Sequence, residues 1–338
     1  MKLDWKSALG IALSGAMLWW TLRGQSVSAV WDVLRHSNVL LLLFAVAVGT
    51  SIFPIRARRW RTILEPVAGF IPFGPLWRST AIGMMMNNVF PFRAGEFARA
   101  YALTREVPRV RITTALGSLA VDRIFDAIVL LALMFGAMLD PAFPPGVKIL
   151  GSTVPQLAAG GITLVVGLLT VCYFMVLQHQ RVMQFVGWVA RRVLPRHEAV
   201  LVKFVEHGVG GLAVLKDSRR FLAVFFWAAL HWLVHALGLY LAFIAVGIEA
   251  PFTAALFLQG VLGIGVSIPS SPGFFGVFEL LSTVGLAVYG VPKELAVSWA
   301  IGYHILSFIP ITVMGGVYFA RLGLSVGAVA GAKEAAPA

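Results

Sequence analysis

Apolar stretches of helical length alternate with shorter polar stretches along the whole chain. Six of the apolar stretches reach or approach the roughly 20 residues that a helix needs to cross the hydrocarbon core of a bilayer. They cover about residues 7–22, 39–55, 112–138, 156–177, 221–247 and 294–320. The pattern predicts an all-α polytopic membrane protein with about six spanning helices.

Two further apolar stretches, 76–92 and 252–290, are broken by proline and glycine. Irregular backbone at membrane depth is tolerated only where protein buries it or where it lines a wet cavity. We therefore expect two re-entrant hairpins, over about 76–105 and 252–290. The first would turn near Pro91 and the second within the run SIPSSPGFFG, although two full spans, giving eight in all, are the alternative for the second.

Composition agrees with a membrane protein and leaves no room for a soluble domain. Hydrophobic residues make up 59% of the 338, charged residues make up 12% and the mean hydropathy is +0.86, whereas a soluble domain carries about 25% charge. The longest polar stretch, 178–220, keeps apolar residues at helical spacing. We expect one integral membrane domain over 1–338. The single Cys172 excludes an internal disulfide.

Positive charge sets the expected orientation, because Lys and Arg collect in cytoplasmic loops. The run RARRWR at 56–61 is interpreted as a cytoplasmic loop after the second helix, and five arginines follow the stretch 76–92. Both termini and 178–220 are then cytoplasmic, and 23–38 and 139–155 lie outside. Residues 181–216 are expected to form basic interfacial helices, or else an ordinary loop, and 325–338 a flexible tail.

A hairpin from each face suggests an inverted repeat, which is the plan of many transporters. The two halves share a faint echo, in which Pro91-x-x-x-Gly95-Glu96 corresponds to Pro269-x-x-x-Gly273 with Glu279 beyond it.

Charged side chains inside the apolar stretches are the strongest functional signal, because each costs on the order of 3 kcal/mol or more at that depth. In VDRIFDAIVLL, Asp122 lies about ten residues, or ~15 Å, into a helix that begins near Arg111, and Asp126 follows one turn later on the same face. Arg123 is the adjacent cation. These charges predict a substrate site, and a structural ion pair between helices is the alternative. Charges expected at similar depth come from the two hairpins, namely Arg93, Glu96, Arg99 and Glu279.

Three histidines also fall within predicted helices. His231 and His235 are four residues apart, and His304 lies midway along the last helix. They could relay protons, or simply form hydrogen bonds between helices. Zinc is disfavoured because HWLVH lacks the glutamate of the zinc-protease helix. No phosphate-binding glycine loop and no Gly-x-Ser-x-Gly turn occurs in the sequence, so we expect no enzyme, no metal and no cofactor.

The broken stretches and the intramembrane charges together resemble a known family. The pattern joins Asn88, PFRAGEFAR from Pro91 to Arg99, DRIFD from Asp122 to Asp126, and Pro269-x-x-Pro272-Gly273-x-x-Gly276-x-x-Glu279. It is similar to the lysylphosphatidylglycerol synthase transmembrane-region family, which includes the flippase half of the bacterial multiple peptide resistance factor. The resemblance runs in order over roughly residues 40–320.

The resemblance implies re-entrant segments around a lipid-accessible cavity that moves a phospholipid or lipid-linked headgroup between leaflets of the bacterial inner membrane. For a translocase of this kind we expect Asn88 and the charged set to bind the substrate, with phosphate contacts by Arg93, Arg99 and Arg123. The carboxylates Glu96, Asp122, Asp126 and Glu279 are expected to hold these arginines or to bind a cationic headgroup, and the glycines and prolines of both hairpins to let a gate bend. Two departures matter. The chain holds no stretch that fits a soluble aminoacyl transferase domain, and Phe274 stands where family members often have a second glycine.

Two other functions stay open from the sequence. One is a membrane-embedded glycosyl or aminoacyl transferase, and the other is a subunit that presents lipid to a partner. Anionic or lipid-linked membrane lipids are the expected partners, with a second copy of the chain or a lipid-synthesis enzyme as further candidates. Nucleic acid is not expected.

Overall fold

The computed structural model describes residues 15–23, 27–90, 94–149, 152–193, 217–265 and 271–329. Within these ranges the chain is helical apart from a two-stranded antiparallel ribbon, β1 (Lys148–Ile149) and β2 (Ser152–Thr153), so the all-α prediction is confirmed. Three helical stretches there are long and apolar enough to cross a membrane: Val39–Ala68, Ser218–Ala245 and Lys293–Arg321.

The first of these stretches joins α3 (Val39–Thr50) to α4 (Ile52–Ala68). Ser51 between them keeps helical angles, with φ −65° and ψ −11°, so the run RARRWR lies inside a helix and its interpretation as a loop is wrong. Buried positions recur at helical spacing straight through the basic run, which explains the continuation. They are Phe53, Arg56, Ala57, Arg59, Trp60, Ile63 and Leu64.

The first broken stretch folds into α5 (Phe73–Val89) and α6 (Gly95–Glu106), which lie antiparallel and in contact. At 1.5 Å per residue these helices are ~26 and ~18 Å long, less than the ~30 Å core. Gly83 and Gly95 let them meet, since a Cβ built on Gly95 would lie 1.9 Å from the Gly83 carbonyl oxygen. The Gly95 N–H donates to Asn87 Oδ1 at 2.9 Å. Pro91 and Arg93 lie outside the described residues.

The second broken stretch contains α12 (Phe252–Gly265), the 3₁₀ turn η3 (Pro272–Phe274) and α13 (Val277–Ala287). The two α-helices are ~21 and ~17 Å long, which favours a hairpin over two full spans. Gly273 and Gly276 take φ +68° and +87°, angles that glycine adopts freely. Phe274 takes φ +63°, so the place where the resemblance leads us to expect a second glycine has a backbone suited to glycine. Pro269 lies outside the described residues.

The remaining helices are α2 (Val27–His36), α7 (Ile112–Ala137), α8 (Val154–Leu177), α9 (His179–Val193), α11 (Ser218–Ala245) and α14 (Lys293–Arg321). The helix α2 lies in a stretch predicted as a loop. Helix α9 begins the predicted interfacial stretch with Phe185 and Trp188 exposed, and 194–216 lie outside the described residues. A helical turn at 326–329 falls in the predicted tail, and Val329 is buried against α5.

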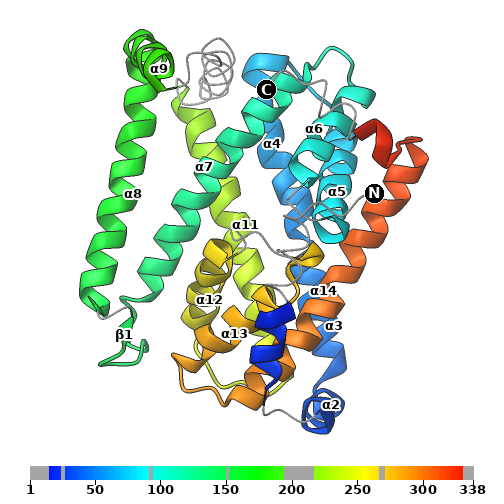
Figure 1. Cartoon of the computed structure of the whole chain (residues 1–338), viewed down its shortest axis with the longest axis vertical. Coiled ribbons are helices and arrows are strands. Elements are labelled where there is room, and N and C mark those ends of the chain that lie inside the picture. The colour runs from blue at the N-terminus through cyan, green and yellow to red at the C-terminus, as the bar shows by residue number, and fades with distance from the viewer. Residues whose placement is uncertain are drawn as a thin grey trace.

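A long helix, a hairpin and a second long helix follow one another twice, as α4, α5–α6, α7 and as α11, α12–α13, α14. Figure 1 shows the first hairpin in the upper half of the molecule and the second in the lower half. Their tips meet, because α5 contacts η3. This is the arrangement expected of hairpins that enter from opposite faces, and a symmetry relation between the halves stays a prediction.

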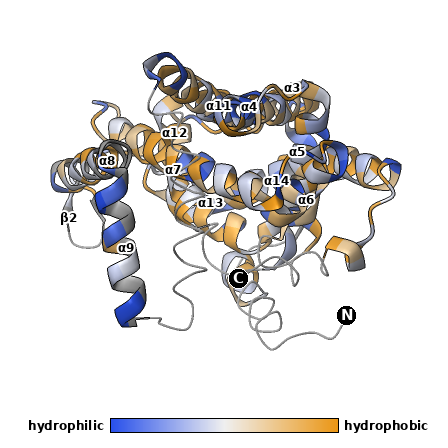
Figure 2. Ribbon diagram, turned by 90° about the horizontal axis from the view of Figure 1, so that it is seen from above, coloured by the Kyte–Doolittle hydropathy of each residue, from blue (hydrophilic) through white to orange (hydrophobic). Residues whose placement is uncertain are grey.

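Seen from above, α3, α4 and α11 form one layer, and α7, α12 and α14 lie in the next (Figure 2). Helices α8 and α9 stand at the edge, where α8 packs against α7. The two layers and the meeting hairpin tips enclose the polar centre of the protein.

Candidate functional site

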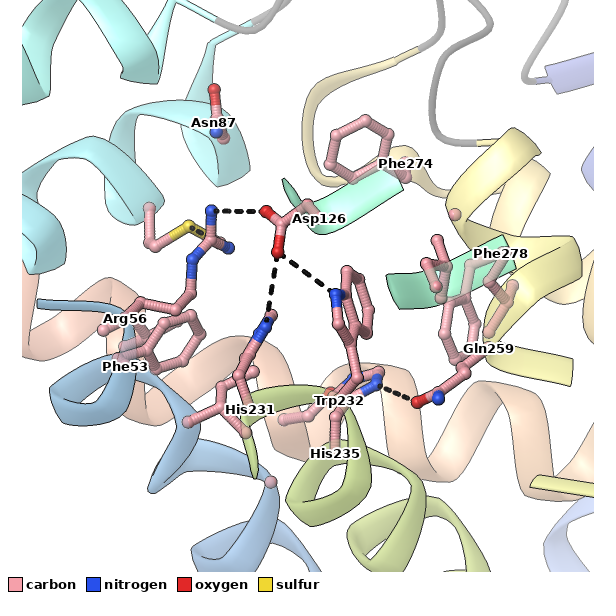
Figure 3. A pocket seen from close by; sticks show the side chains of 18 of the residues that line it. Phe53, Arg56, Asn87, Asp126, His231, Trp232, His235, Gln259, Phe274 and Phe278 are labelled. Atoms are coloured by element: carbon pink, nitrogen blue, oxygen red, sulfur yellow. Dashed lines mark hydrogen bonds and ion pairs between the residues drawn. The ribbon is translucent and has the colours of Figure 1, made fainter. Parts of the chain in front are cut away.

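A cavity of about 770 Å³ lies between the two layers, bounded by both hairpins. Most of its wall is apolar or aromatic, contributed by side chains such as Phe53, Leu130, Phe278 and Phe308. The charged and strongly polar side chains of the wall come from α4, α5, α6, α7, α11, α12 and α14 (Figure 3). They are Arg56, Asn87, Asn88, Glu96, Arg123, Asp126, His231, His235, Gln259 and His304.

Asp126 is the most heavily contacted carboxylate in this wall. Arg59 Nη1 donates to its Oδ1 at 2.7 Å, and the Trp232 indole N–H donates to the same oxygen at 3.1 Å. Arg123 Nη1 lies 3.3 Å and Arg56 Nη2 3.9 Å from its other oxygen. His231 Nδ1 lies 3.6 Å from Oδ1 (Figure 3). The Asp126 carboxylate on α7 therefore links this helix to α4 and α11.

Arg59 and Asp122 lie behind Asp126 and are completely buried. Arg59 Nε donates to Asp122 Oδ1 at 2.6 Å, so one guanidinium bridges two carboxylates that lie one turn apart on α7. The i, i+4 spacing places both carboxylates on one face, and the planar fork of the guanidinium matches them. Asp122 is absent from the cavity lining, and its contacts fit the structural alternative.

Two further cations, Arg99 on α6 and Arg123 on α7, complete the cluster. Arg99 Nη1 lies 3.6 Å from Asp122 Oδ2, and the Arg99 guanidinium stacks 4.1 Å from the centre of the Trp60 ring. Arg123 Nη2 pairs with Glu96 Oε1 at 2.8 Å, which ties α7 to α6. The connected cluster holds four cations and three anions, a formal charge of +1, in Arg56, Arg59, Arg99, Arg123, Glu96, Asp122 and Asp126.

Arg56 differs from the other cluster arginines because it faces the cavity with few partners. Its Nη1 contacts the Met84 sulfur at 3.8 Å, and its only ion pair among the residues that the structure describes is the long contact to Asp126. Within the described part of the chain, its Nε and Nη2 have no hydrogen-bond partner although the residue is 93% buried. A buried guanidinium in this state is prepared to bind an anion.

Glu279 does not join the charged cluster, contrary to the prediction. It accepts from the Gly276 N–H at 2.6 Å, and its other oxygen lies 2.6 Å from His304 Nδ1. It therefore caps α13. Asn88 lines the cavity and donates to Thr312 Oγ1 at 2.8 Å, and its contact with a substrate stays a prediction.

The three histidines lie on the cavity wall but have separate partners. His231 faces Asp126, His235 Nδ1 lies 3.4 Å from Gln259 Oε1, and His304 pairs with Glu279. Their role as a proton relay stays a prediction. Among the described residues, no group of three His, Cys, Asp or Glu side chains is placed to hold a metal ion.

Sequence reasoning missed Arg56, Arg59, Asn87 and Trp232. Charge alone predicts a loop for the two arginines. The apolar stripe of Phe53, Ala57 and Trp60 around them indicates instead that the helix continues. Asn87 and Trp232 carry no charge, and nothing in their local sequence distinguishes them from ordinary helix residues.

Fold and site together define a helical polytopic membrane protein with two short hairpins around a charged, buried cavity. The chain belongs to the family described as the lysylphosphatidylglycerol synthase transmembrane region, whose model matches residues 7–315. The resemblance drawn from its motifs is confirmed.

Curated relatives match over most of the chain. A UPF0104 membrane protein of Methanothermobacter thermautotrophicus is 25% identical over 94% of this chain and 93% of its own length. One of Pyrococcus horikoshii is 23% identical over 91% and 94%. The glycosyltransferase AglD of Haloferax volcanii is 24% identical over 91% of this chain, which spans only 53% of AglD.

Proposed function

We propose that this protein is a lipid translocase that moves a phospholipid or lipid-linked headgroup between leaflets through the central cavity. The observation that carries the proposal is a group of charged side chains, Arg56, Arg123, Glu96 and Asp126, in the wall of a largely apolar cavity. Asp126 lies 14 residues beyond the start of α7, or ~21 Å along it, well inside a ~30 Å core. The bacterial inner membrane, with both termini cytoplasmic, is the proposed location.

A translocase must lower the cost of moving a polar headgroup through hydrocarbon. Fixed charges can replace the water that the headgroup loses, while its acyl chains remain in lipid. A cavity of about 770 Å³ suits a ligand of small-molecule size, so it fits a headgroup without its chains. Apolar lining elsewhere leaves the charged wall as the attractive surface for that headgroup.

The charged residues divide into two proposed roles. Arg56 and Arg123 line the cavity and would contact the phosphate, since guanidinium binds phosphate bidentately and stays charged at depth. Glu96 and Asp126 would hold these arginines, or bind a cationic group of the substrate. Arg59, Arg99 and Asp122 lie behind the wall and would fix its geometry.

The test is transport in proteoliposomes with a fluorescent phospholipid in both leaflets, read by accessibility to an external quencher. Arg56→Gln is expected to slow transport by at least tenfold, since a lost charged hydrogen bond of 1.5–3 kcal/mol corresponds to about that factor. Arg58→Gln is the matched control, because Arg58 lies on the same helix but is exposed. Equal rates in the two folded variants would overturn the assignment of Arg56.

A transferase is the second candidate, favoured by the match to AglD. That match covers about half of AglD, so the glycosyltransferase activity in its name can reside in the half that this chain does not match. Purified protein supplied with lipid and an activated sugar or aminoacyl donor would form a new lipid if it were a transferase. A subunit that presents lipid to a partner would move and modify nothing alone.

A further inference from the structure

The buried pair of His304 and Glu279 holds one more proton than a neutral imidazole and an ionised carboxylate would have, because its hydrogen bonds require it. His304 Nε2 lies 2.9 Å from the Gly273 carbonyl oxygen, which is an acceptor only. The Nε2 atom must therefore carry hydrogen. On the other side of the ring, Nδ1 lies 2.6 Å from Glu279 Oε1. A neutral imidazole and an ionised carboxylate would set two lone pairs against each other across that gap.

One proton resolves this conflict, whichever of the two atoms holds it. With the proton in the gap, the pair is neutral overall, either as imidazolium with carboxylate or as imidazole with carboxylic acid. Both side chains are buried, with 10% and 2% of their surfaces exposed, so loss of the proton would leave a carboxylate charge away from water. The one N–H of the neutral imidazole could then donate to this carboxylate or to the Gly273 carbonyl, but not to both. The Phe275 ring stacks on the imidazole with centroids 4.5 Å apart, and the Phe278 ring lies tilted by 33° at 4.4 Å, so two aromatic rings that favour a cation lie beside it.

The same pair holds the break of the second hairpin closed. His304 comes from α14, and its two contacts fasten the Gly273 carbonyl in η3 and the first turn of α13. Gly273 in turn approaches the first hairpin, since a Cβ built on it would lie 3.3 Å from the Asn88 carbonyl oxygen. The pair is therefore a latch at the point where the two hairpin tips meet.

The latch opens onto the charged cavity, because Gly273, Phe274, Phe278 and His304 all line it. The charged and titratable groups that face the same space come from α14, α11, α4, α7 and α6. They are Tyr303, His231, His235, Arg56, Arg123, Asp126 and Glu96. Helices α3 and α12 carry no titratable side chain, α13 carries only Glu279, and α5 faces the cavity with Asn87 and Asn88.

We propose that His304 and Glu279 form a proton-binding site that latches the second hairpin, and that release of the proton frees the Gly273 carbonyl and loosens the cavity wall. The ligand is a single proton. Because the proton is bound when the latch is closed, raising the pH opens the latch and lowering it closes the latch.

The substitution Glu279→Gln tests whether the latch depends on the extra proton or only on its hydrogen bonds. In Glu279→Gln the amide N–H₂ can donate to His304 Nδ1 while the amide oxygen still accepts from the Gly276 N–H. Neutral His304 can then donate from Nε2 to Gly273. The variant is expected to keep every hydrogen bond of the latch without the extra proton, so it stays closed at high pH. His304→Ala removes the latch at all pH values.

Hydrogen–deuterium exchange of the purified full chain in detergent, across a pH series, is the direct test. The intrinsic pH dependence of exchange is the same in each protein, so the ratio of the wild-type rate to the Glu279→Gln rate cancels it. For peptides covering 271–280 this ratio is expected to rise with pH, whereas His304→Ala exchanges fast throughout. A ratio that stays constant with pH would overturn the proposal.

The transport measurement adds a second arm, which rests on the proposed lipid translocation. Wild-type transport is expected to speed up as pH rises, and Glu279→Gln transport to remain slow at every pH. Exchange that follows pH in a protein that moves no lipid would leave the latch standing and overturn the translocase. Lipid transport by a protein whose exchange ratio stays constant with pH would overturn the latch and leave the translocase standing.

Discussion

Individual side chains in the polar centre follow one rule, in which each buried charge is matched by a partner from another helix. Arg59 shows it most fully, since α4 supplies the cation and α7 supplies both carboxylates. The sequence allowed Asp122 and Asp126 to be predicted as an intramembrane site, because two carboxylates in an apolar run are conspicuous. Their partner could not be predicted, since nothing local identifies a residue 63 positions earlier in the chain.

Removing Arg59 should therefore be far more damaging than removing a peripheral arginine. Arg59→Met leaves two buried carboxylates without their shared cation, and breaking a buried ion pair costs about 3–5 kcal/mol. Arg61→Met is the control, because Arg61 is partly exposed and its pair with Glu65 is expected to contribute about 0–1 kcal/mol.

Unfolding of both variants in detergent, followed by circular dichroism, measures the difference. Adding Asp122→Leu to Arg59→Met should restore part of the lost stability, since one orphaned charge is removed. Similar midpoints for Arg59→Met and Arg61→Met would contradict this account of the cluster.

At the scale of elements, hydrophobic length predicted the long helices well and the charged segments poorly. The segments expected at 112–138 and 294–320 correspond to α7 at Ile112–Ala137 and α14 at Lys293–Arg321. The predicted segment 39–55 ends too early, since α4 continues to Ala68. A run of arginines resembles a loop when the carboxylates that pair with it lie elsewhere in the sequence. Proline and glycine marked both hairpins, since backbone breaks have a local signature that tertiary pairing lacks.

The first hairpin should depend on the absence of a side chain at its closest point. A methyl group at Gly95 would lie 1.9 Å from the Gly83 carbonyl oxygen and 2.5 Å from Asn87 Oδ1, so Gly95→Ala must push α5 and α6 apart. Overpacking of this kind costs about 1–3 kcal/mol. It should also reduce transport by displacing Asn87 and Glu96 in the cavity wall.

Gly136→Ala in α7 is the matched control, because a methyl group there meets nothing within 4 Å. Alanine is favoured over glycine within a helix by up to about 1 kcal/mol, so this variant should be unchanged or slightly more stable. Thermal unfolding of the two variants in the same detergent decides the point, and equal stability would show that the hairpin contact is unimportant.

For the whole molecule, the ends of the helices gather at two opposite faces. Helix α2 and the β1–β2 ribbon lie at one end in Figure 1, and α9 lies at the other. The predicted orientation puts the first end outside the cell and the second in the cytoplasm. This sidedness stays a prediction, which rests on the distribution of Lys and Arg along the whole chain and not on any single pairing.

Single cysteines in a Cys172→Ala background test the orientation. Arg105→Cys and Arg181→Cys should react with a membrane-impermeant maleimide only when the cytoplasmic face is accessible, because both positions are exposed at that end. Ala142→Cys and Glu249→Cys should react from outside intact cells. Labelling of Arg105→Cys and Ala142→Cys from the same side would refute the crossing of α7, and labelling of Arg105→Cys from outside would refute the re-entrant first hairpin.

The separation of Arg59 from its carboxylates has a consequence for how the protein is made. At the usual synthesis rate of roughly 5–20 residues per second, the 63 residues between Arg59 and Asp122 take about 3–13 s to add. During that interval α4 has no counter-charge, and each arginine at mid-membrane costs about 2.5–3.5 kcal/mol on insertion scales. Helix α4 must therefore wait beside water or the insertion machinery until α7 arrives, and the two must enter the lipid as a pair.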